Sequence, residues 1–121
     1  MEKTWTILMV DDNKINQILT KKMIDKVGGL CTLVENGYDA IDLLKTTTFD
    51  IILMDISMPM IDGYETSKMI RELGIKTPII AITAYGRAEV EKKSHENGIT
   101  AIITKPFTSE ILFEEFEKVE R

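Results

Sequence analysis

The chain has 121 residues, of which 44% are hydrophobic and 29% are charged, and its formal net charge is −5. This length and composition predict one globular domain over residues 1–121. No apolar run approaches the roughly 20 residues that a bilayer requires, and residues 1–6 lack the layout of a signal peptide, so we expect a cytoplasmic domain without membrane contact. The acidic charge disfavours direct nucleic-acid binding by this domain, and we expect a protein partner. A lone Cys31 indicates neither a disulfide nor a metal site.

Apolar runs alternate with segments of helical spacing from the start of the chain. Residues 7–10 form a continuous apolar run, which is typical of a strand buried on both faces. A helix is predicted over residues 14–27, because Gly28 and Gly29 supply a stop signal and the preceding segment has helical periodicity. The apolar residues that carry this periodicity are Ile15, Ile18, Leu19, Met23 and Val27.

The middle of the chain continues the alternation. Residues 30–34 are poorer in apolar side chains, which favours an edge strand, and residues 51–54 form another fully apolar run. The helix between these two runs is predicted from Ala40, Ile41 and Leu44. A weaker helix follows, with apolar positions at Ile70 and Leu73 and an end at Gly74.

The last third of the chain holds two more apolar runs, at residues 79–82 and 101–103. The segment 87–97 between them is strongly charged and is the least securely anchored helix; a solvated face and a mobile docking surface explain this charge equally well. A final helix is predicted from Leu112, Phe116 and Val119, with Thr108 as its cap and Phe107 packing on Leu112. Alternating strands and helices indicate right-handed βαβ units, and hence a parallel sheet with helices on both faces.

Polar residues directly follow four of the apolar runs. They are Asp11 with Asp12, then Asp55, then Thr83, and finally Thr104 with Lys105. Because the carboxyl ends of parallel strands share one edge of a sheet, we expect these side chains to meet in one pocket. Taken alone, Asp11 and Asp12 are more simply a helix cap, and Lys105 is more simply a surface residue before a turn. The occurrence of polar residues after all four runs is what favours a functional site.

Three carboxylates in one crevice repel one another, so they must bind protons or a cation. Oxygen ligands select a hard cation such as Mg²⁺, whereas Zn²⁺ would require histidine or cysteine. A metal beside a lysine and a threonine hydroxyl suits phosphoryl transfer, in which Asp55 would be the nucleophile and an aspartyl phosphate the product. Lys105 would pair with one phosphoryl oxygen and Thr83 would donate a hydrogen bond to another. The adjacent Asp11 and Asp12 suit the metal.

These residues are similar to the motifs of a known family. The chain resembles the receiver domain of two-component response regulators from about residue 6 to residue 119. The motifs that carry this resemblance are residues 10–13 (Val-Asp-Asp-Asn), residues 54–56 (Met-Asp-Ile), Met58 with Pro59, Asp62 with Gly63, residues 81–84 (Ala-Ile-Thr-Ala), and Lys105 with Pro106.

The resemblance implies a flavodoxin-like, doubly wound α/β fold, with five parallel strands in the order 2-1-3-4-5 and five helices. It also implies that Asp55 receives its phosphoryl group from a phosphohistidine on a histidine kinase or a histidine phosphotransfer domain. Asp12, Asp55 and the backbone carbonyl of Ser57 would bind Mg²⁺, for which Mn²⁺ could substitute, and Asp11 would act largely through water. The peptide bond before Pro106 would be cis.

Two details refine the resemblance. Asn13 and Asn16 look like the corresponding residues of receivers attached to hybrid sensor histidine kinases, so the chain is either a module of such a protein or a free-standing phosphorelay protein. Ile102 stands where the family usually carries an aromatic residue that turns inward with the threonine. Switching is therefore expected to act through the loop with Tyr85 and Gly86 and through the fourth helix.

An alternative function is a small Mg²⁺-dependent phosphohydrolase with an aspartyl nucleophile. Such enzymes typically place two aspartates one residue apart after the first strand and carry a cap, whereas Asp11 and Asp12 are adjacent and the chain leaves no room for a cap. A flavodoxin-like nucleotide binder would require a phosphate-cradling loop after the first strand, which the sequence lacks. A receiver domain is not a conventional enzyme, although it supports its own phosphorylation and dephosphorylation.

Overall fold

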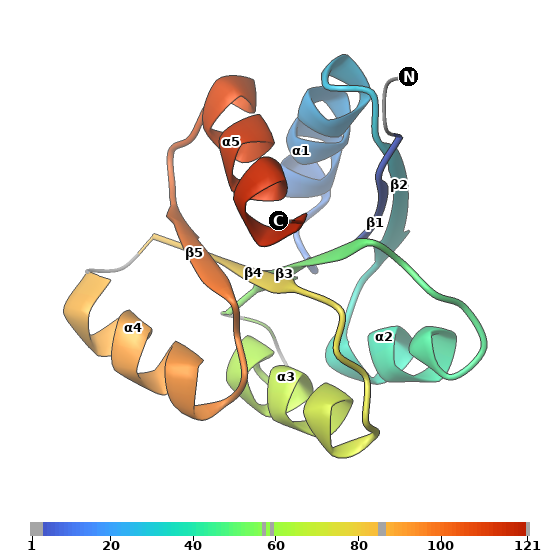
Figure 1. Cartoon of the computed structure of the whole chain (residues 1–121), viewed down its shortest axis with the longest axis vertical. Coiled ribbons are helices and arrows are strands. Elements are labelled where there is room, and N and C mark those ends of the chain that lie inside the picture. Colours follow the sequence, from blue (N-terminus) through green and yellow to red (C-terminus); the bar gives the residue numbers. More distant parts are fainter. Residues whose placement is uncertain (1–3, 57, 59, 85–86, 121) are drawn as a thin grey trace.

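Strands and helices alternate strictly along the chain (Figure 1). The computed structural model describes residues 4–56, 58, 60–84 and 87–120. In this part of the chain the strands are β1 (Thr6–Val10), β2 (Leu30–Val34), β3 (Ile51–Asp55), β4 (Ile79–Thr83) and β5 (Ala101–Thr104). The helices are α1 (Lys14–Lys26), α2 (Gly37–Leu44), α3 (Gly63–Glu72), α4 (Arg87–Glu96) and α5 (Ser109–Glu120). Each predicted element is present, with ends within a few residues of those expected.

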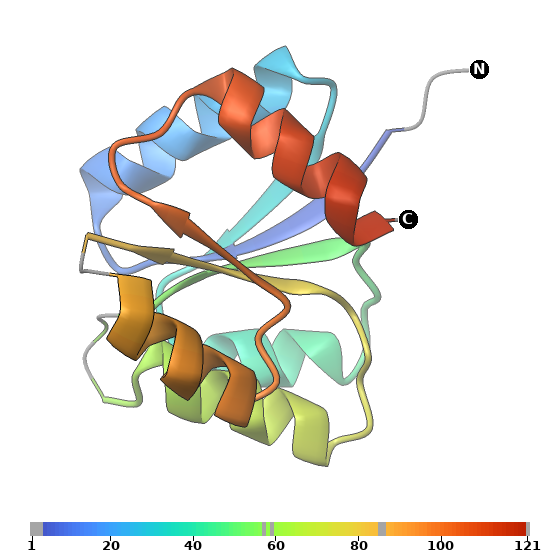
Figure 2. The ribbon, with the colours of Figure 1, turned by 60° about the vertical axis from the view of Figure 1, so that its left-hand side comes forward.

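All of these strands belong to one parallel sheet in the order β2-β1-β3-β4-β5. Helices α1 and α5 cover one face of the sheet, and α2, α3 and α4 cover the other (Figures 1 and 2). The predicted fold class and strand order are confirmed. Among the described residues, no helix has both the length and the apolar character that crossing a membrane would require.

The core consists of two apolar layers, one on each side of the sheet. Successive strand side chains point to opposite faces, so Leu8 and Ile52 pack in the layer with α2, α3 and α4, whereas Ile7 and Leu53 pack in the layer with α1 and α5. Every residue of β3 and β4 is buried. Burial on both faces explains why these strands read as continuous apolar runs.

The apolar spacing that predicted α1 does not mark its buried side. The side chains that α1 buries are Gln17, Thr20 and Ile24. The exposed fractions of the apolar residues in its first half are 68% for Ile15, 56% for Ile18 and 51% for Leu19. Met23 and Val27 are only partly buried against the core. The predicted span of α1 is confirmed, but Ile15, Ile18 and Leu19 of the predicted apolar set do not belong to the face that packs on the sheet.

A hydrogen bond explains why α1 buries an amide. The Gln17 Nε2 atom donates to the backbone carbonyl of Asp11 over 2.5 Å, and the pair is buried. Buried polar groups are tolerated when they find such a partner. Gln17 therefore fixes the start of α1 against the end of β1, and no sequence pattern predicted this contact.

The cap predicted for α5 is present. The Thr108 Oγ1 atom accepts a hydrogen bond from the Ile111 backbone N–H over 3.2 Å, and Phe107 packs against the apolar layer that contains Leu112. At the start of α1, the Asn13 side chain accepts a hydrogen bond from the Asn16 N–H over 2.9 Å. Such caps satisfy backbone donors that the first helical turn leaves without partners.

Arg71, at the end of α3, joins three loop carbonyls. Its Nε atom donates to Gly98 over 3.0 Å, and one terminal nitrogen donates to Ile75 over 2.9 Å and to Thr77 over 2.8 Å. Burial lowers the pKa of the guanidinium. Arg71 thus ties α3 to the segment that enters β4 and to the turn that leaves α4.

Candidate functional site

The carboxyl ends of β1, β3, β4 and β5 meet at one edge of the sheet. Asp55 and Thr83 are the last residues of β3 and β4, and Asp11 and Lys105 directly follow β1 and β5. The Lys105 backbone N–H donates to the Thr83 carbonyl over 2.8 Å, which fixes the start of the lysine segment beside β4. The peptide bond between Lys105 and Pro106 is cis, as the resemblance implied.

These strand ends surround an open cavity of about 340 Å³, which we call the strand-end cavity. It is lined by Asp12, Asn13, Asn16, Asp55, Thr83, Ala84 and Lys105. Asp55 and Thr83 are buried, whereas Asp12 is exposed. The structure therefore places the predicted nucleophile, hydroxyl donor and lysine around one space that solvent can reach.

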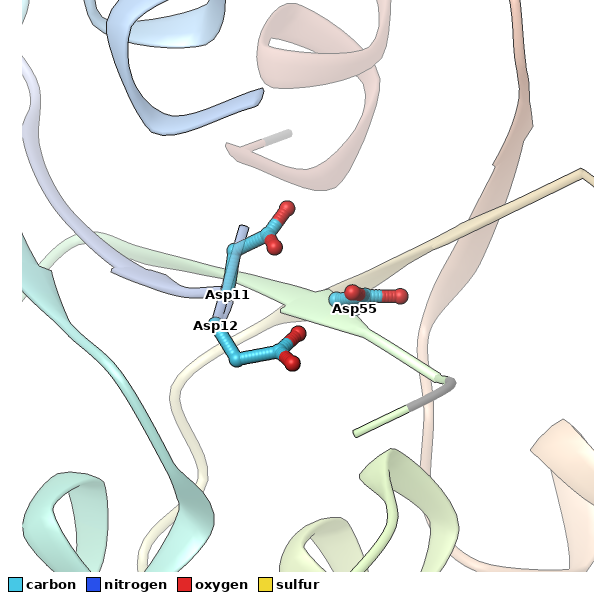
Figure 3. A group of neighbouring side chains, drawn as sticks. All are labelled: Asp11, Asp12 and Asp55. Carbon is cyan, nitrogen blue, oxygen red and sulfur yellow. The ribbon is translucent and has the colours of Figure 1, made fainter. Parts of the chain in front are cut away.

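Asp11, Asp12 and Asp55 form a compact acidic group. Each offers one carboxylate oxygen, and these oxygens all lie within 4.8 Å of one another. In Figure 3 the side chains of Asp11 and Asp12 leave the end of β1 beside Asp55 at the end of β3. The sequence predicted that these carboxylates would meet, and the parallel sheet brings them together.

Asp11 is the most buried of the three, with 1% of its surface exposed. Burial raises the pKa of Asp11, while the Asn13 backbone N–H, which donates to its Oδ1 over 2.9 Å, and the charge of Lys105 act in the opposite direction. The nearby charge of Asp12 raises the Asp11 pKa further. Burial is thus the main reason that Asp11 resists carrying a charge.

The donor set of this group fits a hard divalent cation. All three residues supply carboxylate oxygens, and the described residues that line the strand-end cavity include neither histidine nor cysteine. Oxygen ligands of this kind suit Mg²⁺ rather than Zn²⁺. The predicted ligand carbonyl of Ser57 lies outside the described residues, as do Tyr85 and Gly86 of the predicted switching loop.

Gly63 allows α3 to begin directly against the end of β3. A Cβ atom on Gly63 would lie 2.6 Å from the Asp55 carbonyl oxygen and 2.8 Å from the Ile56 Cα. Both neighbours are backbone atoms, which cannot move aside as a flexible side chain does. The glycine of the Asp62 and Gly63 motif, which is the first residue of α3, is therefore required by packing beneath the site.

A model of the response regulator receiver domain family matches residues 7–117. The chain belongs to this family. Sensor histidine kinase RcsC of Salmonella typhimurium is 36% identical over 106 residues, covering 88% of this chain and 11% of the kinase. Sensor histidine kinase GacS of Pseudomonas protegens is 33% identical over 107 residues, covering 84% of this chain and 12% of the kinase. The receiver domain thus spans about a tenth of the length of these curated relatives.

Solved receiver structures share the fold over nearly the whole chain. The receiver domain of sensor histidine kinase PA1611 from Pseudomonas aeruginosa, solved with a magnesium ion coordinated in the active site cleft, is 32% identical with a TM-score of 0.88, and 98% of each chain is covered. Chemotaxis response regulator CheY4 of Vibrio cholerae is 25% identical with a TM-score of 0.89, covering 97% of this chain and 99% of CheY4.

The face of the receiver domain formed by α4 and β5 contains a second hollow. A cavity of about 330 Å³ is lined by Glu91, Ser94, His95, Ile99, Thr100, Ala101 and Ile102. Ser94 is 2% exposed, and its Oγ atom has no hydrogen-bond partner among the described residues. Ile102, at the position where an aromatic residue was expected, is partly buried against the core. This hollow therefore lies beside the residue that departs from the family pattern.

Sequence reasoning missed two residues at the site. Gln17 supports the Asp11 carbonyl, and Asn16, noted in the sequence only as a feature of a receiver subtype, lines the strand-end cavity. A signal for Gln17 exists only in hindsight: it is polar, yet it shares a helix face with the buried Ile24.

Proposed function

We propose that this receiver domain accepts a phosphoryl group on Asp55 from a phosphohistidine of a partner protein. The observation that carries the proposal is that Asp12, Asp55, Thr83 and Lys105 line one open cavity. The carboxylate of Asp11 lies beside those of Asp12 and Asp55. A phosphoryl group carries negative charge on several oxygens, and positioned opposite charges and hydrogen-bond donors stabilise its transfer.

Each residue of the site has a separate proposed role in the transfer. Asp12, Asp55 and the Ser57 carbonyl would hold Mg²⁺, or Mn²⁺ in its place, and Asp11 would act through water. The cation supplies neutralisation of the charge on the phosphoryl oxygens when it is bound. An Asp55 carboxylate oxygen forms the bond to phosphorus, and the bond from phosphorus to the donor nitrogen breaks with its electron pair remaining on that nitrogen. Lys105 pairs with one phosphoryl oxygen, and Thr83 donates a hydrogen bond to another.

A histidine kinase or a histidine phosphotransfer domain is the proposed donor. The curated relatives RcsC and GacS are sensor histidine kinases, of which the matching region is a small part. The exposed apolar side chains of Ile15, Ile18 and Leu19 lie on the helix that borders the strand-end cavity, which suits a donor protein better than a small free metabolite. The net charge of −5 supports the absence of direct nucleic-acid binding by this domain. We place the domain in the cytoplasm and treat residues 1–121 as one unit.

Phosphorylation is proposed to act on the loop after Thr83 and on α4. The new group adds a charge of about −1.5 to −2 at neutral pH, which attracts Thr83 and Lys105 toward Asp55. Two features support α4 as the responding element. Of its side chains that the structure describes, Val90 and Ser94 are the buried ones, and the hollow beside Ile102 provides space for rearrangement.

The test compares the parent chain with Asp55→Asn. Each is incubated with Mg²⁺ and either acetyl phosphate or a phosphorylated histidine donor, and bound phosphate is measured together with its stability in acid and base. We expect the parent to gain an acid-stable, base-labile phosphate and Asp55→Asn to gain none. Asp62→Asn is the matched control, because the exposed Asp62 only caps α3 and asparagine also caps helices.

Two results would contradict the proposal: a parent chain that gains no such phosphate, or an Asp55→Asn variant that gains as much as the parent. Continuous turnover of an unrelated phosphoester, in place of a single bound phosphate per chain, would instead favour the phosphohydrolase alternative.

A further inference from the structure

Asn16 lies on the first turns of α1, between two cavities. It lines the strand-end cavity and also a neighbouring cavity of about 210 Å³, which we call the side cavity. The side cavity is lined by Asp11, Asn16, Leu19, Thr20, Met23, Ile82, Lys105, Pro106 and Phe107. Asn16 and Lys105 are the residues that the two cavities share. Asn16 is therefore positioned at the boundary between a charged space and a largely apolar one.

Asn16 differs from the two neighbouring amide residues, whose side chains form hydrogen bonds within the described part of the chain. The neighbouring Asn13 side chain caps α1, and the Gln17 side chain holds the Asp11 carbonyl. The carboxamide of Asn16 is half-buried but makes no hydrogen bond with any described residue, since only its backbone N–H is bound. One of the three amides at the start of α1 is thus available to a molecule that enters the cavities.

We propose that the Asn16 Oδ1 atom accepts a hydrogen bond from the imidazole N–H of the donor phosphohistidine, which makes Asn16 a contact of the leaving group. The inference rests on the proposed function. In an in-line displacement, the donor ring lies on the side of phosphorus opposite the attacking Asp55 oxygen. Because Asp55 is buried and the strand-end cavity is open, we expect the ring on the solvent side of the phosphorus atom. The side cavity offers apolar walls beside that position.

The hydrogen bond has a defined role in the transfer. As the Asp55 oxygen bonds to phosphorus, the electron pair of the breaking bond remains on one ring nitrogen, while the other ring nitrogen keeps its proton. The ring then leaves as neutral imidazole instead of an anion. An acceptor at Asn16 favours the protonated ring and so assists departure, whereas a donor without an imidazole gains nothing from it.

The experiment compares two small donors on the purified chain with Mg²⁺. Phosphoimidazole carries the ring and acetyl phosphate does not. We expect Asn16→Ala to lower the rate of Asp55 phosphorylation by phosphoimidazole about tenfold or more, which corresponds to losing one hydrogen bond to a charged group, and to change the acetyl phosphate rate less than about twofold. Lys22→Ala, exposed on α1 and lining neither cavity, is the matched control and should leave both rates unchanged.

Asn16→Asp separates the acceptor role from other roles, because it keeps an acceptor oxygen and loses the amide donor. Its added charge should repel both anionic donors, but the carboxylate is also a stronger acceptor for the protonated ring. The ratio of the phosphoimidazole rate to the acetyl phosphate rate should therefore be at least that of the parent. The melting temperatures of both Asn16 variants should match that of the parent.

An equal loss with both donors in Asn16→Ala, or no loss with either, overturns the inference. It is also overturned if the donor ratio falls as far in Asn16→Asp as in Asn16→Ala. A parent chain that neither donor phosphorylates contradicts the proposed function itself. A phosphorylated parent with an unchanged ratio in Asn16→Ala contradicts only the role of Asn16.

Discussion

Asp11 is a buried carboxyl group at the site, and its burial has a cost for the stability of the fold. Burial raises its pKa above the ordinary value of 3.8, so Asp11 binds a proton more readily in the folded chain than in the unfolded chain. The stability contributed by that protonated carboxyl is present below the unfolded pKa and is lost as pH rises through the folded one. At neutral pH and without a divalent cation, the ionised Asp11 therefore destabilises the fold.

We accordingly predict that Asp11→Asn is more stable than the parent when divalent cations are chelated. The amide removes the buried charge but can still accept the hydrogen bond from the Asn13 N–H. The melting temperature near neutral pH should rise by roughly 4 °C, which corresponds to about 1 kcal/mol in a domain of this size. The difference should vanish in acid, where Asp11 is protonated. A lower melting temperature for Asp11→Asn with chelator would contradict this account.

Cys31 provides a second prediction at this scale. Burial raises the pKa of its thiol from 9.0 to about 11, and only the thiolate is nucleophilic. Alkylation by iodoacetamide should be slow at mildly alkaline pH and should accelerate about tenfold per pH unit up to the shifted pKa. Alkylation of the unfolded chain in denaturant serves as the reference. A rate in the folded chain that levels off near the ordinary pKa would show that the thiol is not perturbed.

Among the helices, α1 shows that apolar residues at helical spacing are not always the buried ones. Ile18 is 56% exposed, whereas Ile24 on the same helix is fully buried. We predict that Ile18→Lys changes the free energy of unfolding by no more than about 0.5 kcal/mol. Ile24→Lys should cost about 3 kcal/mol or more, because it buries an unpaired charge. Urea unfolding measures both free energies. Similar losses of stability in the two variants would mean that Ile18 also packs on the core, as the apolar spacing predicted.

Arg71 bonds both the segment that enters β4 and the turn that leaves α4, so replacing it should destabilise both segments. Arg71→Lys keeps the charge but cannot reach the carbonyls of Gly98, Ile75 and Thr77 together, so we expect a loss of about 2 kcal/mol in the free energy of unfolding. Hydrogen exchange should accelerate at the Thr100 N–H, which bonds Ile79 beside the turn. The exposed Lys68→Ala on α3 is the control. Unchanged exchange at Thr100 would argue against the bridging role.

At the scale of the whole molecule, the acidic group links metal binding to stability. A cation that binds Asp11, Asp12 and Asp55 in the folded chain cannot find the same arrangement in the unfolded chain, so Mg²⁺ should raise the melting temperature. The gain should reach about 2.7 kcal/mol when Mg²⁺ exceeds its dissociation constant about a hundredfold. Sodium chloride at equal ionic strength is the control, and an equal effect of both salts would indicate screening in place of binding.

The sheet and the position of the site were accessible from the sequence. Strands buried on both faces must be apolar throughout, so β1, β3 and β4 are recognisable without any other information. Polar residues directly after such strands must gather at one edge once the strands are parallel. That reasoning placed Asp11, Asp12 and Asp55 together, although their roles in metal binding and phosphoryl transfer stay predictions.

The contacts that support the site were not accessible in this way. Gln17 is buried because the Asp11 carbonyl lies within its reach, and Arg71 matters because three carbonyls from two loops converge on it. Neither set of hydrogen bonds produces a periodic pattern in the sequence, because each depends on the positions of backbone carbonyls in other segments.

The alternation of elements, the parallel sheet and the acidic edge follow from the amino-acid sequence, because burial on two faces and strand direction act through local composition and chain order. Three other features follow from tertiary packing: the side of α1 that faces the core, the lack of a hydrogen-bond partner for the Asn16 carboxamide among the described residues, and the close approach of the three carboxylates. These features depend on the packing of segments far apart in the chain, for which the sequence has no local code.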